Sequence, residues 1–448
     1  MRMNAVWQSI LTILLALPAS ARAQQVTVPT DSSPRHRISW PGRYGPTHDG
    51  HVPAKESINL PTEWNEETGQ NILWKTPLPG LGHSTPVIGD GRIWMTSATA
   101  DGTQQFVLCV DETTGQLLHQ KLLFENTDPE PLGNNVNTYA SPSCVLEPDA
   151  LYVHFGTYGT ARLDPETLEV VWQRRDIRCR HFRGPGSSPV VYDNLIILTF
   201  DGIDQQFVIA LDKKTGQTVW RTDRSTDYGD VDADGTIRAN GDYRKSYNTP
   251  ALTEVDGRMQ LISTGARAAF GYDARTGEEI WTITHDDFNG CAVPLLHKGT
   301  TLINTGSGRA NLICVKLDST TRGNVDKTHV LWNRDKGNSD LSSPILVGDL
   351  VFQIATNGVG FCVHAQTGEQ IWRSRVAGGT YVASPILANG LIYLFNEEGQ
   401  GTVIRVGEEL EIVASNSLNE GMRSSPAVAN GALFLRTFHH LYKIGPKE

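Results

Sequence analysis

One short segment concentrates positive charge in a chain that is otherwise acidic. Five arginines and one histidine fall within residues 174–183. Guanidinium groups bind carboxylates or sulfates through paired hydrogen bonds, so this segment could form an anion site. The alternative is that these arginines pair with surrounding carboxylates, as surface arginines commonly do. His181 and Arg183 are the best candidates for ligand binding, because they lie closest to the strand start at Ser188-Pro189.

A second segment has the spacing of a calcium-binding loop. Asp230, Asp232 and Asp234 alternate and are followed by Gly235. Alternating carboxylates before a glycine suit the sharp wrap that calcium coordination requires. However, Gly241 stands at the twelfth position, where a helix-loop-helix calcium site would carry glutamate. The alternative is an acidic, solvated loop that binds no metal.

Polar and aromatic residues also recur just ahead of several expected strands. They are Arg244, Lys245, Tyr247, Tyr381 and Arg423, together with Asn137, Tyr139, Asn289 and Asp340. If these strand starts meet around a channel, the residues would form a rim suited to a planar cofactor, an oligosaccharide or a peptide. The alternative is a water-filled channel without a ligand.

The elements that position these residues come from an internal repeat. A small residue followed by proline opens an apolar strand eight times, at Pro86, Pro142, Pro189, Pro250, Pro294, Pro344, Pro385 and Pro426. Each copy continues through a turn and a second strand to a third and a fourth strand. Eight units of four antiparallel strands predict an all-β fold, an eight-bladed β-propeller. The last copy lacks its fourth strand, and residues 71–75 stand alone before the first, so this N-terminal strand should complete the eighth blade.

The turn between strands three and four has a recurring pattern, Asp-x-x-Thr-Gly-x-x-x-Trp, seen at residues 212–220 and 273–281. Glycine permits the positive φ of the turn, and tryptophan supplies an apolar plate that should pack on the neighbouring unit. Two copies depart from the pattern, with Leu168 in place of glycine and His119 in place of tryptophan.

The six cysteines divide into two groups. Cys109, Cys314 and Cys362 occupy equivalent repeat positions in different units, which predicts small buried residues with free thiols. Cys144, Cys179 and Cys291 are less constrained, and the sequence does not assign a disulfide among them.

The repeat resembles the tryptophan-docking motif of eight-bladed quinoprotein propellers. These are the folds of pyrroloquinoline-quinone (PQQ) alcohol dehydrogenases and of the outer-membrane β-barrel assembly lipoprotein. Residues 40–50 resemble the entry segment of exported PQQ-binding-like β-propeller repeat proteins of the planctomycete type, and residues 154–159, 181–189 and 440–444 are similar to that group as well. The resemblance covers residues 38–445 and implies the fold, whereas function must be argued from the site.

The composition and the N-terminal residues limit the possible ligands and the possible location of the protein. The chain has 448 residues and a formal net charge of −10, which argues against nucleic-acid binding. Residues 1–23 have the pattern of a secretory signal peptide cleaved after Ala23, which predicts an exported, periplasmic or extracellular protein without a transmembrane anchor. We expect an entry segment over 24–70, the propeller over 71–445, and a monomer.

Two functions are consistent with this sequence. The favoured one is a non-catalytic binding or scaffold protein that recognises a protein, a peptide or an envelope glycan on its channel face. The alternative is a PQQ-dependent dehydrogenase of alcohols or sugars, with PQQ and calcium as candidate cofactors. The resemblance implies that such enzymes carry adjacent cysteines over the quinone, and this chain has no adjacent cysteines. No catalytic residue is assigned from the sequence.

Overall fold

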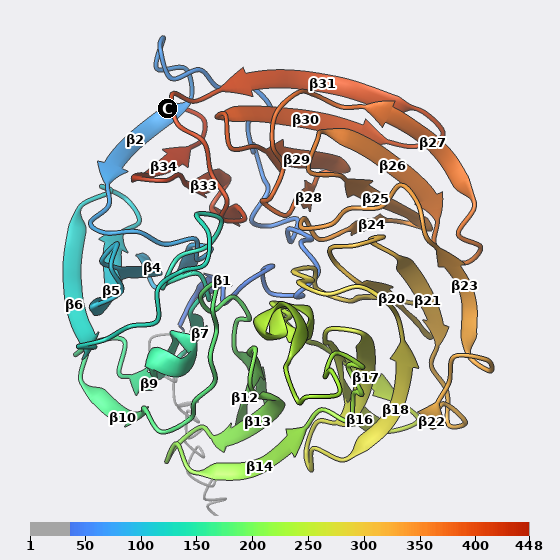
Figure 1. Cartoon of the computed structure of the whole chain (residues 1–448). Helices are drawn as coiled ribbons and strands as arrows, with labels where there is room; N and C mark the ends of the chain where they lie inside the picture. The colour runs from blue at the N-terminus through green and yellow to red at the C-terminus, as the bar shows by residue number, and fades with distance from the viewer. Residues whose placement is uncertain (1–35, 448) are drawn as a thin grey trace, which may run out of the picture. The chain divides into compact units, whose positions relative to one another are not determined.

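The computed structural model describes residues 36–447, and β-strands dominate them. Eight sheets surround a central channel, as Figure 1 shows. The predicted eight-bladed propeller is therefore confirmed. Two short 3-10 helices, η1 (Gly156–Tyr158) and η2 (Arg238–Arg244), interrupt the strands. The expected signal peptide lies outside the described residues.

Each blade has four antiparallel strands, with the fourth at the outer rim (Figure 1). Blade 1 contains β3 (Val87–Gly89), β4 (Arg92–Ala98), β5 (Gln104–Asp111) and β6 (Leu117–Glu125), and blade 2 contains β7 (Val145–Glu147), β8 (Ala150–His154), β9 (Thr160–Leu163) and β10 (Val170–Arg174). Blade 3 contains β11 (Val190–Tyr192), β12 (Leu195–Asp201), β13 (Gln206–Asp212) and β14 (Thr218–Asp223), and blade 4 contains β15 (Ala251–Val255), β16 (Arg258–Thr264), β17 (Ala268–Asp273) and β18 (Glu279–Thr284). Blade 5 contains β19 (Leu295–His297), β20 (Thr300–Asn304), β21 (Leu312–Lys316) and β23 (Val330–Arg334). Blade 6 contains β24 (Ile345–Val347), β25 (Leu350–Ile354), β26 (Val359–His364) and β27 (Gln370–Arg375). Blade 7 contains β28 (Ile386–Ala388), β29 (Leu391–Phe395), β30 (Gln400–Val406) and β31 (Leu410–Ser417). Two further strands extend blades 1 and 4: β1 (Ile38–Trp40) pairs with β3, and β22 (Gly323–Asn324) pairs parallel with β18.

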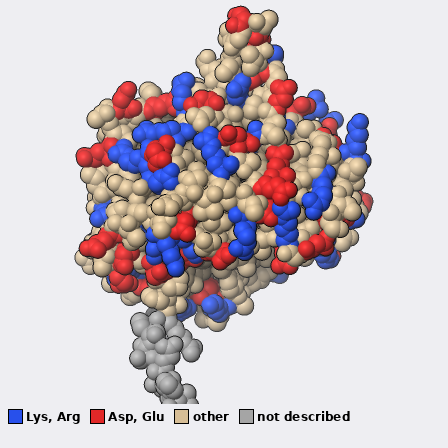
Figure 2. Space-filling model, turned by 90° about the horizontal axis from the view of Figure 1, so that it is seen from below, with Lys and Arg blue, Asp and Glu red and all other residues tan. Residues whose placement is uncertain are grey.

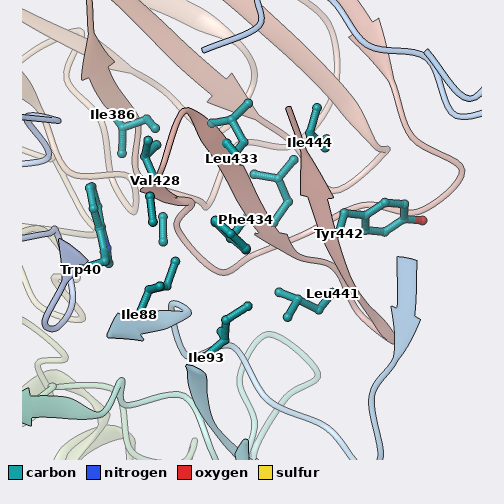
Figure 3. Close-up of a cluster of buried hydrophobic side chains, with 14 of the residues drawn as sticks. Trp40, Ile88, Ile93, Ile386, Val428, Leu433, Phe434, Leu441, Tyr442 and Ile444 are labelled. Carbon is teal, nitrogen blue, oxygen red and sulfur yellow. The ribbon is translucent and has the colours of Figure 1, made fainter. Parts of the chain in front are cut away.

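Blade 8 is built from both ends of the chain. Its strands β32 (Ala427–Ala429), β33 (Ala432–Arg436) and β34 (His440–Ile444) are followed in space by β2 (Ile72–Pro77). The pairing of β2 with β34 runs from Ile72 opposite Ile444 to Pro77 opposite His440, so the predicted N-terminal closure is confirmed. Figure 3 shows the core at this closure, where side chains of β1 and of blades 1, 7 and 8 pack together.

The entry segment makes an excursion inside the channel (Figure 1). Its first described residues bind the turn between β3 and β4, where the Arg37 amide donates to Asp90 at 2.7 Å. It leaves beside the turn between β32 and β33, where the Gly431 amide donates to the Glu56 carbonyl at 2.8 Å. Between these points, residues 42–45 form a turn at the other end of the first strands, because the Arg43 side chain reaches the Cys291 carbonyl and the Tyr44 hydroxyl reaches the Ser343 carbonyl. Residues 37–56 therefore fill part of the channel, and we call them the plug.

Consecutive blades are linked around the channel by one recurring hydrogen bond. A backbone amide just before the first strand of one blade donates to the hydroxyl of the equivalent serine or threonine in the next blade. The six such bonds, of 2.9–3.2 Å, run from Thr85 to Ser143, Ser143 to Ser188, Ser188 to Thr249, Val293 to Ser343, Ser343 to Ser384 and Ser384 to Ser425. This hydroxyl belt is the physical reason for the small hydroxyl residue in the repeat.

The remaining two junctions use other groups. Between blades 4 and 5, Val293 lacks a hydroxyl, and the Asn248 amide group donates to the Ala292 carbonyl instead. Between blades 8 and 1, the buried Arg436 donates to the Ser84 hydroxyl at 2.6 Å and to the Thr96 carbonyl at 2.7 Å. In blade 2 the belt residue is Ser143, which follows Pro142, so here the proline lies two residues ahead of its place in the other blades.

At the outer rim, the tryptophan of one blade packs on the turn glycine of the next, as the repeat predicts. A methyl group on the glycine would collide with the indole in four such pairs: Trp74 with Gly115, Trp172 with Gly216, Trp220 with Gly277, and Trp332 with Gly368. The two departures from the repeat face each other across one junction. His119 is exposed on blade 1, and the turn of blade 2 carries the buried Leu168. Because no indole covers this turn, it tolerates a side chain.

The hydroxyl belt can be tested at Ser343, which accepts from the Val293 amide at 3.1 Å. The variant Ser343→Ala should lower the free energy of unfolding by about 1–3 kcal/mol, because it leaves a buried amide without a partner. Ser374→Ala, at an exposed position of β27, is the matched control. Urea denaturation measures both. Equal stability of the two variants would contradict a role for the belt.

The rim contact can be tested at Gly277, whose φ is +75° and where a methyl group would lie 2.5 Å from an indole carbon of Trp220. Gly257 in the same blade has a φ of +76° and open space around it, so it isolates the backbone cost. Gly257→Ala should cost about 1–2 kcal/mol from its left-handed backbone. Gly277→Ala should cost about 1–3 kcal/mol more because of the collision. Similar unfolding free energies for both variants would remove the Trp220 contact from the stability of the ring.

Candidate functional site

A cavity of about 300 Å³ lies in the channel, above the tip of the plug. Residues from all eight blades line it, most of them just ahead of a first strand, and Arg43 contributes from the plug. The lining consists of Arg43, His83, Thr85, Asn134, Val136, Asn137, Ser141, Ser143, Arg183, Gly186, Tyr247, Asn289, Cys291, Ser307, Leu341, Val382, Ser384, Arg423 and Ser425. The cavity is therefore formed only when the ring is complete and the plug is in place.

Two of the three arginines in the lining are neutralised by carboxylates. Arg183 donates to Asp242 at 2.7 Å, and Arg423 binds Glu397 through two bonds of 2.8 and 2.9 Å. Arg423 also donates to the carbonyls of Asn135 and Val136, at 2.6 and 2.8 Å. It thereby fixes the long loop between blades 1 and 2 across the mouth of the channel.

Arg43 differs from these two arginines. Its guanidinium donates to the Cys291 carbonyl at 3.1 Å, and no carboxylate of residues 36–447 lies within 4.0 Å of it. Burial lowers the pKa of Arg43, while the nearby Cys291 and Tyr44 oppose that shift. A guanidinium remains charged at neutral pH, so a single uncompensated positive charge faces the cavity.

The structure brings some of the candidate residues together and separates others. Arg183, Tyr247 and Arg423 line the cavity. His181 and Lys245 are buried behind its wall. Tyr381 is fully buried in the core between blades 6 and 7, and its neighbour Val382 lines the cavity instead.

His181 and Lys245 hold the backbone of the wall. The His181 ring accepts a hydrogen bond from the Thr157 amide at 3.1 Å and lies 3.6 Å from the Cys179 sulfur. The Lys245 ammonium donates to the His181 carbonyl and lies 4.5 Å from the centre of the Tyr247 ring. Burial lowers the pKa of Lys245 to about 8, and it lowers that of His181 well below its usual value. These contacts orient Tyr247 at the cavity.

Most of the arginine-rich segment pairs with carboxylates, as the alternative interpretation expected. Arg174 pairs with Asp176 at 2.6 Å, and Arg180 pairs with Glu130 at 2.9 Å. Within this segment, Arg183 reaches the cavity.

The acidic loop does not gather its carboxylates. Asp230 pairs with Arg244 at 2.7 Å, and Asp232 pairs with Arg238 at 2.9 Å. Asp234 is exposed and accepts from the Thr236 amide at 2.9 Å. Among residues 36–447, no group of three or more histidines, cysteines, aspartates or glutamates is arranged to hold a metal ion. The aspartates instead fix Arg244 and Arg238.

All six cysteines are free thiols, and Cys109, Cys314 and Cys362 are buried as predicted. Cys291 lines the cavity, and burial raises its pKa to about 11.

Among the arginines of the lining, Arg43 is the one that the sequence did not indicate as a candidate. It lies between glycines at 42 and 45, in the segment that carries the family resemblance. An arginine in a glycine-rich turn is the one signal that could have marked it.

The fold and its channel cavity define a class, the eight-bladed propellers of quinoprotein type. A family model described as "Outer membrane protein assembly factor BamB" matches residues 32–175, 62–224 and 208–409. The chain belongs to this BamB-like family of PQQ-like propeller repeats. None of the curated proteins compared with the chain matches it.

Solved structures share the fold at low sequence identity. BamB from Moraxella catarrhalis is 13% identical, with a TM-score of 0.55 over 83% of this chain and 99% of that one. The quinohemoprotein alcohol dehydrogenase from Comamonas testosteroni is 11% identical, with a TM-score of 0.62 over 91% and 81%. A europium-containing methanol dehydrogenase is 11% identical, with a TM-score of 0.60 over 89% of each chain. The fold is thus shared by an outer membrane protein assembly factor and by dehydrogenases.

The role of Lys245 in the cavity wall has a pH signature. The folded lysine loses its proton near pH 8, whereas the unfolded lysine keeps it up to about 10.5. Unfolding therefore takes up a proton between these values, and this group makes the native state more stable as the pH rises through them. The full contribution is about 3 kcal/mol, at about 1.4 kcal/mol per pKa unit.

The variant Lys245→Met should lack this increase in urea-denaturation free energy between pH 8 and pH 10. Lys214→Met, at an exposed lysine, controls for the loss of one positive charge. Parallel pH profiles for the native protein and Lys245→Met would contradict a buried ammonium in the wall.

Proposed function

We propose that this protein is an exported, non-catalytic binding protein whose ligand enters the channel mouth. The ligand is a protein segment, a peptide or an envelope glycan. The observation that carries the proposal is the cavity, because every blade contributes to its lining and the plug closes its far end. Concave sites with a few fixed polar groups are the usual form of ligand-binding sites.

The rigidity of the cavity wall supports a binding role. The hydroxyl belt fixes the strand starts, and ion pairs fix Arg183 and Arg423. A site whose side chains are held before the ligand arrives loses little conformational entropy on binding. The cavity is thus preorganised.

Export is supported by the signal pattern in residues 1–23 and by the family, whose description is an assembly factor of outer-membrane proteins. No helix of residues 36–447 is long and apolar enough to cross a membrane. On the side seen in Figure 2, lysines and arginines are interspersed with acidic residues, so this side offers no continuous basic surface for nucleic acid.

The alternative enzyme would bind PQQ, and the cavity does not fit this group. PQQ carries three carboxylates, whereas the described lining offers one arginine without a carboxylate partner. The lining also contains no aspartate or glutamate among the described residues, although calcium prefers carboxylate oxygens. We therefore derive no catalytic step through PQQ and favour the binding protein.

The proposal can be tested by filling the cavity. Val382→Trp places a large side chain in its lining, and Val219→Trp makes the same change at an exposed position on β14. Ligands from a panel of monosaccharides, sugar acids and tripeptides should bind the native protein and Val219→Trp in equilibrium dialysis. The same ligands should bind Val382→Trp at least tenfold more weakly.

Equal binding to both variants would move the ligand site away from the cavity. Stoichiometric PQQ binding with turnover of an alcohol or sugar would overturn the non-catalytic proposal.

A further inference from the structure

The cavity carries a surplus of hydrogen-bond donors. The hydroxyls of Ser143 and Ser425 each accept a backbone amide of the belt, and neither finds an acceptor for its own proton among residues 36–447. Arg43 uses its guanidinium for one carbonyl bond. The described lining also contains no carboxylate that could accept from these groups. Donors without acceptors favour a ligand rich in oxygen lone pairs.

The charges of the cavity lining indicate the charge that the ligand should carry. Arg183 and Arg423 are neutralised by their own carboxylates, so Arg43 leaves one positive charge uncompensated in the lining. One guanidinium matches a monoanion such as a carboxylate, which it can bind through two parallel hydrogen bonds. A phosphate monoester would bring nearly two negative charges at neutral pH and would leave one of them unpaired.

Polar atoms without partners surround the same place. The Nε atoms of Arg43 and Arg183, the hydroxyl of Tyr247 and the side-chain oxygen of Asn289 are buried and have no hydrogen-bond partner among the described residues. All four residues line the cavity. Buried polar groups are normally paired, so four unpaired ones around one cavity indicate a site built for a polar occupant.

The rest of the lining indicates what the occupant carries besides its anion. Ten lining residues bear hydroxyls or carboxamides, and three are aliphatic. These hydroxyls and carboxamides can form hydrogen bonds with the hydroxyl groups of a ligand. The volume of about 300 Å³ lies at the small end of ligand sites.

From these observations we propose that the cavity binds a sugar acid, with its carboxylate on Arg43 and its hydroxyls on the serine and asparagine side chains of the lining. This assignment rests on the proposed binding function and names the ligand class for the same cavity. The sugar acid is either free or the acidic end of a glycan.

The first experiment compares galacturonate with galactose, which differ in carrying a carboxylate or a neutral hydroxymethyl group. Isothermal titration of the native protein should give galacturonate an affinity at least tenfold higher than that of galactose. The neutral methyl ester of galacturonate should bind no better than galactose. This comparison needs no variant, so it does not depend on the folding of an altered chain.

The second experiment uses Arg43→Gln, which removes the charge, and Arg43→Lys, which keeps it. Arg43→Gln should lower galacturonate affinity at least tenfold and galactose affinity by a much smaller factor, while Arg43→Lys should retain part of the difference. Arg405→Gln is the matched control, because Arg405 is an exposed arginine that pairs with Glu411 on blade 7. It should bind galacturonate like the native protein.

The outcomes separate this inference from the proposed function. Equal affinities for galacturonate and galactose, both lost in Val382→Trp, would overturn the sugar acid and leave the binding protein in place. Tighter binding of triglycine than of galacturonate, lost when the peptide is amidated, would assign the carboxylate to a peptide end and also overturn the sugar acid. Binding that Val382→Trp leaves unchanged would overturn both proposals.

Discussion

The hydrogen bond from a backbone amide of one blade to a serine or threonine hydroxyl of the next is the interaction on which the ring depends. It fixes the start of each first strand relative to its neighbour, and those starts carry the cavity lining. Its geometry is directional, so the six bonds, three on each side of the junction between blades 4 and 5, run the same way around the channel. An arginine and an asparagine take its place at the other two junctions. The same contact therefore holds the ring and shapes the cavity.

The outer rim adds a second, apolar contact at four of the junctions. At this radius the blades diverge, and an indole ring fills the gap that a serine bridges near the channel. The junction between blades 1 and 2 shows that the two partners of this contact are linked, because the tryptophan and the glycine are both absent there. Inner polar bonds fix the strand starts, while the outer indole rings add apolar packing.

The fold could be predicted from the sequence because its signals are local and repeated. The proline-marked strand starts appear in all eight blades and the Thr-Gly turns in four of them, and the unpaired strand at residues 71–75 indicated how the ring closes. The cavity was less predictable. Side chains alternate in direction along an extended chain, so Val382 faces the cavity while Tyr381 is buried. The sequence alone does not show which of the two neighbours faces the cavity.

Arg43 could not be placed from the sequence for a different reason. Its contact with Cys291 spans 248 positions and depends on the path of the plug, which no repeat describes. Likewise, the partners of Asp230 and Arg183 follow from loop conformations that the spacing of charges does not determine.

The closure by β2 has a consequence for the order in which the molecule is made. The strand is synthesised long before its partner β34, because most of the propeller lies between them in the sequence. Until then, the plug has no completed channel to occupy, and the β2 edge has no strand to pair with. Contacts between such distant segments form slowly, because a long loop must close before they stabilise anything. The ring therefore closes only after β34 has been made, and a chaperone that shields an unpaired strand would act on β2.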